Sequence, residues 1–503
     1  MLVLPILLAL AATQCDASLQ PVMQALRENS VAKASVLLQS VPEECRQSSS
    51  FFELTGITDE LSGNSLAAET SLRKAIALDP KSARLREQLG AIYLRDKKAA
   101  EAVAELKQAV ALDPANAVVK KYLIGAYVQA REWPHAAALF DQIGGAGSDS
   151  RDPIMVLWFA QTLIETKQFG RIDRDISPEQ AGMPPALLFS LGTLFAQHGM
   201  YRRAVQFLQQ IPSEQADDAV YFNLGLAYSH LQAFDDARRN YFRAIDKHPD
   251  HVEAYFRVGL DYSAAGQGAK AVPWLFRARD LASKRPDIAY ALAEQLLQLK
   301  YVESAEKVVA EAFETSTGNP ILLVARADIE QQQSRPAAAM DNYKKALAQQ
   351  PKLIVALVGL ARVSVSQGND DEAKKYLRNA LSIDSNDPLA NGELGSLDAR
   401  QEDWVSALPH LNKAWTADQS NRTVGLQLAR ALRHSNRCTE ALHVLTSLRP
   451  SMDDSSAFHL ELAQLYSQIH RPAEARKERD VLAKLEAQAQ DSIHFDNPTT
   501  YVH

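Results

Sequence analysis

Small residues recur at an almost constant spacing along this chain of 503 residues. Successive members lie 34 residues apart, with one step of 33. They are Ala68, Ala102, Ala136, Gly170, Ala204, Ala237, Ala271, Ala305, Ala339, Ala373, Ala407, Ala441 and Ala475. A small residue kept at one place in every period indicates that two helices cross closely there. The spacing predicts an all-α solenoid of helix-turn-helix repeats, and such an array does not resemble a catalytic domain.

Other positions of the period support two helices per repeat. With the recurring small residue numbered position 20, position 8 is also small in most repeats and position 27 is often alanine. Large apolar residues fill positions 7, 11 and 24, as in Leu224, Tyr228 and Tyr241, which is the apolar stripe of two amphipathic helices. Position 32 is proline at Pro80, Pro114, Pro249 and Pro351. Proline lacks the N–H that would continue a helix, so it closes the repeat.

This pattern resembles the tetratricopeptide repeat family, whose repeats carry small residues at positions 8 and 20, alanine at 27 and proline at 32. Residues 89–114 and 221–249 match best. The resemblance covers about thirteen repeats from residue 49 to residue 489, with a weaker fourteenth over 15–48. It implies a right-handed superhelix whose concave face is lined by the first helix of every repeat, at positions 2, 5, 9, 12 and 13. It also implies a function in binding.

Departures from the pattern divide the chain into blocks. Residues 18–150 are predicted to form N-terminal repeats, and residues 185–489 C-terminal repeats that end in a polar capping helix. Between them, residues 151–184 keep the spacing but carry Trp158 where position 8 should be small. Turn-rich stretches flank this degenerate repeat, so it is either a bend between the blocks or simply a diverged repeat. Residues 490–503 are predicted to be a disordered tail.

The N-terminus begins with an apolar run over residues 2–12. These eleven residues are too few to span a bilayer and are typical of the core of a secretory signal. Residues 1–17 are therefore predicted to be a signal peptide, cleaved after Ala11 or Ala17, and the protein to be periplasmic or secreted. No basic residue precedes the run, so an apolar first helix of a cytoplasmic protein is the alternative. A lipid anchor on Cys15 is a weaker alternative, because the residues before it fit a lipobox poorly.

The cysteines and ionisable residues predict no chemistry. Cys15, Cys45 and Cys438 show no paired spacing, so no disulfide framework is expected. The twelve histidines are scattered, and the glycines of residues 144–147 follow no strand, so we expect no metal, no cofactor and no enzyme. The net charge is −7, without a dense basic stripe. Nucleic acid is therefore not an expected partner, and membrane association is not predicted.

The groove of such a superhelix offers two candidate strips for peptide binding. Aromatic residues occupy position 5 of four consecutive repeats, and leucines at position 9 extend them: Phe189, Phe222, Phe256, Tyr290, Leu226 and Leu260. Facing an open groove they would hold an extended peptide or an amphipathic helix, and otherwise they pack in the core. Basic residues follow in later repeats: Arg362, Arg400, Arg430 and Arg433. On a shared face they would attract an acidic segment, and otherwise they are solvated surface arginines.

These features favour a non-enzymatic scaffold or adaptor that holds peptide segments of partner proteins in its groove. One alternative is a structural subunit of a cell-envelope assembly or export machine, for pili, polysaccharide or secretion. Another is an enzyme, or the regulatory arm of one, whose site the sequence does not reveal.

Overall fold

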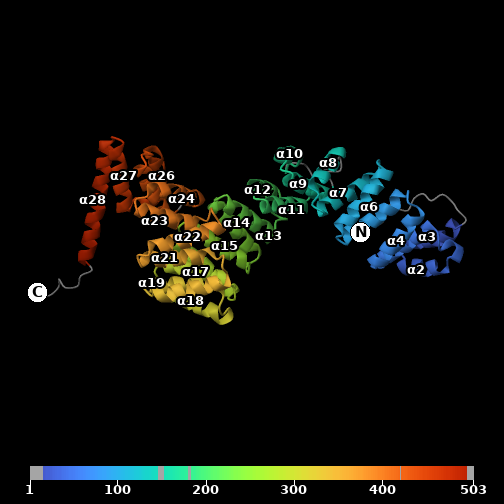
Figure 1. The fold of residues 1–503 in the computed structure, drawn as a ribbon, viewed down its shortest axis with the longest axis horizontal. Helices are drawn as coiled ribbons and strands as arrows, with labels where there is room; N and C mark the ends of the chain where they lie inside the picture. The colour runs from blue at the N-terminus through green and yellow to red at the C-terminus, as the bar shows by residue number, and fades with distance from the viewer. Residues whose placement is uncertain (1–14, 146–151, 179–182, 420, 496–503) are drawn as a thin grey trace. The chain divides into compact units, whose positions relative to one another are not determined.

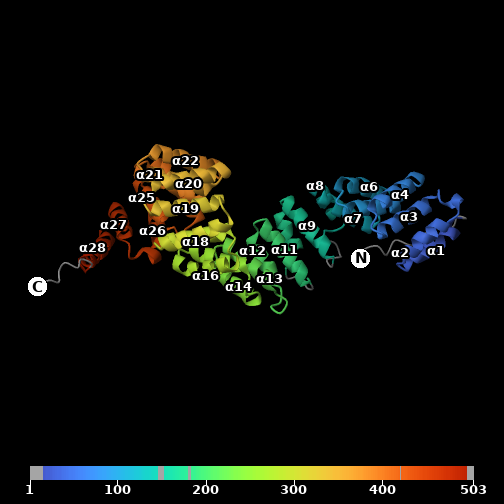
Figure 2. The ribbon, with the colours of Figure 1, turned by 90° about the horizontal axis from the view of Figure 1, so that it is seen from below.

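The computed structural model describes residues 15–145, 152–178, 183–419 and 421–495. These residues form 28 α-helices and one short 3₁₀-helix, and no strand occurs among them. The helices pair in chain order, and within each of two units the pairs stack one after another (Figures 1 and 2). The predicted all-α solenoid is confirmed. The apolar run of the predicted signal peptide lies outside the described residues.

Internal contacts divide the chain into two units, residues 1–216 and 217–503. The helices of the first unit are α1 (Asp16–Arg27), α2 (Val31–Ser40), η1 (Glu43–Cys45), α3 (Ser49–Leu61), α4 (Ser65–Leu78), α5 (Ala83–Arg95), α6 (Ala99–Leu112), α7 (Ala117–Gln129), α8 (Trp133–Gln142), α9 (Pro153–Glu165), α10 (Phe169–Asp175), α11 (Pro185–Gln197) and α12 (Tyr201–Leu208). The division falls C-terminal to the degenerate repeat, and a bend at that repeat stays a prediction.

The second unit contains the other eight helix pairs. They are α13 (Asp218–His230), α14 (Phe234–Lys247), α15 (Val252–Ala264), α16 (Gly268–Leu281), α17 (Pro286–Gln298), α18 (Val302–Thr315), α19 (Pro320–Gln332), α20 (Pro336–Gln349), α21 (Ile354–Ser366), α22 (Asp370–Ile383), α23 (Pro388–Arg400), α24 (Trp404–Ala417), α25 (Arg422–His434), α26 (Cys438–Met452), α27 (Ser456–Gln468) and α28 (Pro472–Phe495). Within this unit the array curls back on itself. The Nε2 of Gln232, before α14, donates to the carbonyl of Ala417, at the end of α24, over 3.4 Å.

Local chemistry sets where the helices begin. Most first helices start at a side chain that accepts a hydrogen bond from a free N–H of the first turn, which stabilises the helix end. These caps are Ser48, Ser82, Asn116, Asp152, Asp217, His251, Asn319, Asp387, Asn421 and Ser455. Each capped helix therefore has a fixed starting residue.

The turn inside every helix pair contains one residue in the left-handed region. Four of these are glycines, namely Gly63, Gly199, Gly266 and Gly368, and this region has no steric cost for glycine. The other ten are Asn29, Lys97, Arg131, Lys167, Gln232, Lys300, Ser334, Glu402, Asn436 and His470. The same turn therefore closes all fourteen pairs, whichever residue occupies it.

The close helix crossings predicted from the small residues are present. Ala102, Ala237 and Ala339 at position 20 are fully buried. At position 8, a Cβ added to Gly225 would lie 2.4 Å from the ring of Tyr241, sixteen residues later. The large residue at position 24 therefore fills the space that the missing side chain leaves, which explains why positions 8, 20 and 24 recur together.

The repeat over residues 151–184 does not keep the predicted register. Its left-handed turn residue is Lys167, two residues later than the constant spacing requires. Ile172 is the fully buried residue of its second helix, whereas Gly170 has no neighbouring atom within 4 Å of an added Cβ. The prediction that Gly170 occupies the helix crossing is therefore wrong. The connection between α8 and α9 holds extra residues, and the regular alanine series conceals this shift.

The shifted register accounts for the tryptophan of this repeat. Trp158 stands two positions earlier in the repeat than predicted, and the small position 8 is the fully buried Ala160. The indole packs instead on the preceding first helix, α7. A Cβ added to Gly125 would lie 2.5 Å from Trp158 Cη2. Trp158 thus occupies a space that only a glycine leaves open.

A disulfide joins Cys15 and Cys45 at the ends of the first helix pair, with their Cα atoms 5.4 Å apart. The prediction of no disulfide is wrong because the hairpin of α1 and α2 returns the chain to its own start. Leu19 and Val22 of α1 pack in the same buried cluster as Cys45. Residue 17, the predicted end of the signal peptide, therefore falls inside the first helix of the solenoid.

The last helix is longer than the sequence predicts. Residues 490–495, assigned to a disordered tail, belong to α28, and only 496–503 lie outside the described residues. No helix in the described part of the chain is long and apolar enough to cross a membrane.

Candidate functional site

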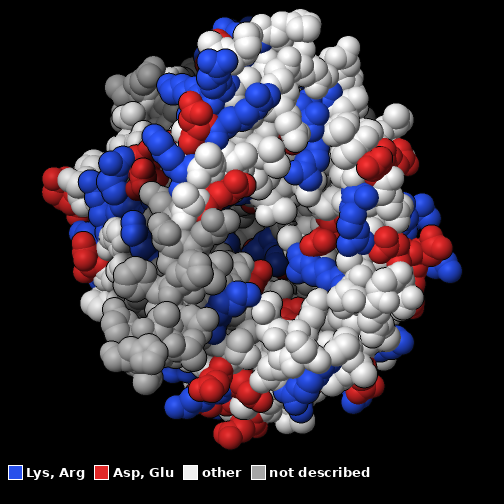
Figure 3. Space-filling model, turned by 90° about the vertical axis from the view of Figure 1, so that its left-hand side faces the viewer, with Lys and Arg blue, Asp and Glu red and all other residues white. Residues whose placement is uncertain are grey.

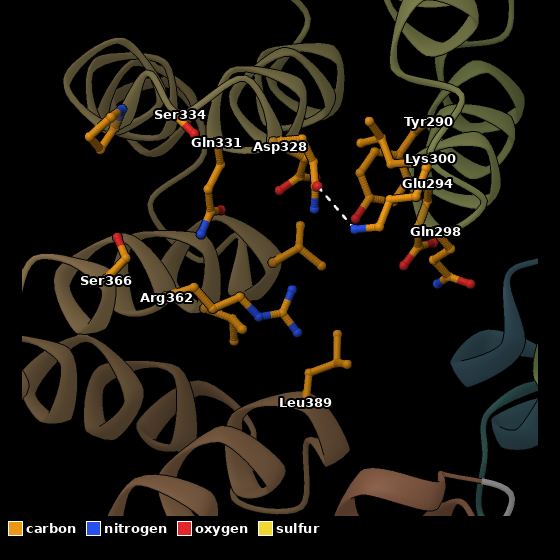
Figure 4. A pocket seen from close by; sticks show the side chains of 15 residues that line it. Tyr290, Glu294, Gln298, Lys300, Asp328, Gln331, Ser334, Arg362, Ser366 and Leu389 are labelled. Carbon is orange, nitrogen blue, oxygen red and sulfur yellow. Dashed lines mark hydrogen bonds between the residues drawn. The ribbon is translucent and has the colours of Figure 1, made fainter. Parts of the chain in front are cut away.

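A hollow of about 790 Å³ opens on the second unit, on the face formed by first helices. Its walls come from four consecutive repeats, through α17, α19, α21 and α23 (Figure 4). The lining residues are Tyr290, Glu294, Leu297, Gln298, Lys300, Asp328, Gln331, Gln332, Ser334, Pro336, Val355, Val358, Arg362, Ser366 and Leu389. Those on the first helices stand at positions 2, 5, 9, 12 and 13 of their repeats. The positions that the family resemblance assigns to the concave face therefore meet in one space.

Polar side chains from facing helices point into this hollow. Figure 4 shows Tyr290 and Glu294 of α17 on one side, Asp328 of α19 beside them, and Arg362 of α21 opposite. The Arg362 guanidinium pairs with the Glu393 carboxylate on the next repeat, with Nε and Oε1 2.6 Å apart. Its charge is therefore compensated inside the structure.

In the part of the chain that the structure describes, no cation pairs with the other two carboxylates of the hollow. The Asp328 carboxylate accepts a short hydrogen bond from the Tyr343 hydroxyl. Within the described residues, Glu294 has neither a hydrogen bond nor an ion pair, although its side chain is exposed to the hollow. Lys300, at the rim, donates from Nζ to Gln332 Oε1 over 3.4 Å. The acidic groups of the hollow are thus left without a direct counter-charge.

The surroundings of these two acids raise their pKa values. Burial raises the pKa of Asp328 to about 6, while the Tyr343 hydrogen bond and the charge of Arg362 act in the opposite direction. Partial desolvation between the walls of the hollow also raises the pKa of Glu294, although its side chain reaches the open space. Desolvation disfavours the charged form of a carboxyl group. A cation entering the hollow would therefore stabilise the ionised form of both acids.

The predicted aromatic strip is only partly open. Phe256 is buried in the core, where the Arg285 guanidinium lies over its ring at 5.2 Å. Phe222 is half-buried, and its ring lies 4.8 Å from that of His251. Tyr290 lines the hollow. The strip is therefore not a continuous apolar track, and Tyr290 is its member at the candidate site.

The remaining members of that strip are less exposed to partners than an open groove would require. Leu226 and Leu260 are half-buried, and Leu260 packs against the core of the second unit. Phe189 is half-buried on α11 of the first unit. None of these three lines the hollow.

The predicted basic strip is largely neutralised. Arg400 Nη2 lies 2.7 Å from Asp370 Oδ1. Arg430 and Arg433 both pair with Glu461, and Arg433 makes the closer contact, with Nε and Oε1 2.5 Å apart. Together with the Arg362 pair, these contacts engage all four predicted arginines within the solenoid. These ion pairs join neighbouring repeats. A structural role therefore explains why arginine recurs at these positions, and no ligand is needed to explain it.

Five residues of the hollow are not among the binding residues predicted from the sequence: Glu294, Leu297, Asp328, Val355 and Leu389. The signal that identifies them is the repeat register itself, since all five stand at positions of the expected concave face. Aromatic and basic residues were predicted to bind instead, because each type recurs at the same repeat position or close to it.

Charges of both signs cover the end of the chain that carries α27 and α28. Figure 3 shows lysine and arginine side chains interspersed with aspartate and glutamate on that face. No group of three or more potential metal ligands occurs among the described residues.

Two family models match the chain, and both describe a tetratricopeptide repeat. One matches residues 93–155 and 331–392, the other residues 62–117 and 222–286. The chain carries tetratricopeptide repeats. It is 24% identical over 264 residues to the TPR repeat-containing protein YpiA of Bacillus subtilis, a match that covers 52% of this chain and 62% of YpiA.

Two further comparisons extend over more of this tetratricopeptide-repeat protein. Anaphase-promoting complex subunit 3 of Schizosaccharomyces pombe is 20% identical over 306 residues, which are 60% of this chain and 46% of that subunit. The crystal structure of yeast Tom70 is similar at a TM-score of 0.40 and 14% identity, covering 90% of this chain and 97% of Tom70. The protein thus spans less than two thirds of the length of both curated relatives. Tetratricopeptide-repeat proteins are generally non-enzymatic scaffolds that mediate protein–protein interactions.

Proposed function

We propose that this tetratricopeptide-repeat protein is a non-enzymatic adaptor that holds peptide segments of partner proteins on the first-helix face of its second unit. The hollow between α17 and α23 is the anchor of that surface. The observation that carries the proposal is its construction from four consecutive repeats, which contribute polar and apolar side chains to one open space. Ligand sites commonly combine a concave apolar surface with a few converging polar groups.

The exposed apolar residue at the edge of the hollow supports peptide binding. Leu389 on α23 is 42% exposed although it is a large aliphatic side chain. An extended segment laid across several first helices would cover it while its side chains enter the hollow. Because the predicted aromatic and basic strips are mostly packed or paired, we place the binding surface at the hollow rather than along those strips.

Site-specific photocrosslinking in the native host tests this surface. A photoreactive residue at position 389 reports on the hollow, and one at Val405, an 82% exposed aliphatic residue on the second helix α24, is the matched control. We expect a discrete adduct from 389 but not from 405, with the crosslink mapping to one segment of the partner. Adducts from 405 alone, or equal labelling from both, would contradict the proposed surface.

We also propose that the protein works outside the reducing cytoplasm. The Cys15–Cys45 disulfide supports this location, because such bonds persist mainly in oxidising compartments. It also bears on processing, since cleavage after Ala17 would remove Cys15, whereas cleavage after Ala11 retains it. A thiol engaged in a disulfide cannot carry a lipid, which argues against the lipid-anchored alternative.

Fractionation of the host followed by intact-mass analysis tests location and processing together. We expect the protein in the periplasmic or extracellular fraction, beginning at Ala12 and two hydrogens lighter before reduction than after it. A cytoplasmic protein with free thiols would refute export, and a mature chain beginning at Ser18 would refute retention of Cys15. A role as a structural subunit of an envelope machine stays a prediction that partner identification would test.

A further inference from the structure

We propose that the hollow binds a lysine or arginine side chain, presented by an extended segment of the partner protein. This inference rests on the proposed function and specifies the chemistry of its partner. The cationic head would lie between the carboxylates of Glu294 and Asp328, and the methylene stem along the apolar wall. The partner segment is therefore basic at this one position.

The charges that line the hollow favour a cation. The charge of Arg362 acts on both acids, but its guanidinium is already paired with Glu393 at 2.6 Å. Among the described residues that line the hollow, the other cation is Lys300 at the rim, which is engaged with an amide oxygen. An entering ammonium or guanidinium group would supply the charge-assisted hydrogen bonds that the two carboxylates lack.

The shape and polarity of the walls suit the long stem of a basic side chain. The half-buried Val355 and the exposed Leu389 give the hollow apolar surface, and the buried Leu297 and Val358 also line it. Lysine and arginine bury their methylene groups along such surfaces while keeping the charged head at polar groups. The Tyr290 ring adds an aromatic group near the same acids, and cations are attracted to aromatic faces.

An acidic side chain fits the same space less well. It would have to displace Glu393 from Arg362 or share that arginine with it. It would also place a third negative charge beside Glu294 and Asp328, which already resist ionisation because of their surroundings. The arrangement of partners around Arg362 thus selects against a carboxylate.

Peptide selection on the intact chain identifies the preferred side chain. A random dodecapeptide display library is panned against the wild-type protein, and the strongest peptide is then measured by fluorescence anisotropy. The variants are Glu294→Gln, Glu294→Gln with Asp328→Asn, and Arg362→Gln. The amide oxygen introduced by Asp328→Asn can still accept the Tyr343 hydrogen bond, and Glu294 is exposed, so these variants should fold. Glu303→Gln, an exposed acid on the second helix α18, is the matched control.

We expect the selected peptides to share one lysine or arginine. Replacing that residue by alanine, or introducing the double variant, should weaken binding by about tenfold or more, while Glu303→Gln changes it less than about twofold. Selected peptides that share an acidic residue and depend on Arg362 would overturn this inference and leave the adaptor function standing, as would hollow-dependent peptides without a basic residue. If no peptide is selected, or if no substitution in the hollow changes the binding, the result would count against both the adaptor function and the basic side chain inferred here.

Discussion

Replacing Gly125 by alanine tests how Trp158 packs between α7 and α9. The new Cβ would lie 2.5 Å from Trp158 Cη2 and 2.9 Å from Cζ3. Carbon atoms in contact prefer about 3.5 to 4.0 Å, so the indole would have to move by about 1 Å. Such overpacking costs about 1 to 3 kcal/mol, and the better helix propensity of alanine offsets about 1 kcal/mol of it. We expect a net loss of up to about 2 kcal/mol in the free energy of unfolding.

Gly170→Ala is the matched control, because Gly170 is also helical and in the same unit, with no atom within 4 Å of the new Cβ. It should be neutral or stabilise the protein by up to about 1 kcal/mol. Urea unfolding followed by circular dichroism measures both, and adding Trp158→Phe to Gly125→Ala should recover part of the loss in a double-mutant cycle. Equal shifts for the two glycine variants, or no coupling between positions 125 and 158, would refute this packing.

Three further outcomes follow from buried groups. Burial raises the pKa of Asp261 to about 6 from its ordinary 3.8, so the folded state binds the proton more tightly and this residue adds stability as pH falls. Between pH 8 and pH 5 its contribution should grow by about 1 to 1.5 kcal/mol, and Asp261→Asn should remove that increment from urea unfolding curves. Cys45→Ser opens a crosslink between residues 30 apart and should cost about 3.5 kcal/mol, seen as faster hydrogen exchange in α1 and α2, whereas Cys438→Ser, a free cysteine, should leave that exchange unchanged. Ala339→Leu at a fully buried crossing should destabilise by about 1 to 3 kcal/mol, and the exposed Ala337→Leu on the same helix should not; equal melting of the two would contradict the crossing.

The repeat period predicts most of the fold because it reports packing directly. Each alanine at position 20 marks a crossing that admits no larger side chain, so the pairing of α5 with α6 or α19 with α20 follows from spacing alone. The period does not predict a local change of packing that leaves the spacing of the small residues unchanged. Gly170 keeps the spacing of the series, yet Ile172 is the buried residue, because a shift in one connection is reversed before the next repeat.

The candidate site is less predictable because it depends on which charges meet. The register identifies which positions face the hollow, but Arg362 looks the same in the sequence whether it is free or paired with Glu393. Pairing depends on side-chain directions between neighbouring repeats, which no periodicity encodes. The Cys15–Cys45 bond was missed for a related reason, since hairpin closure and not sequence spacing brings the two thiols together.

The left-handed turn residues make this array a practical scaffold for engineering. Eight of the fourteen turns hold a residue that is neither glycine nor asparagine, and such residues are strained in that region. Glycine at any one of them except Gln232, whose side chain donates to Ala417, should raise stability by about 0.5 to 1 kcal/mol. Because the turns lie about one repeat apart, the gains should add. Five of these seven, all except Lys300 and Ser334, lie away from the hollow, so stepwise substitution can stabilise the protein while its binding surface is left intact.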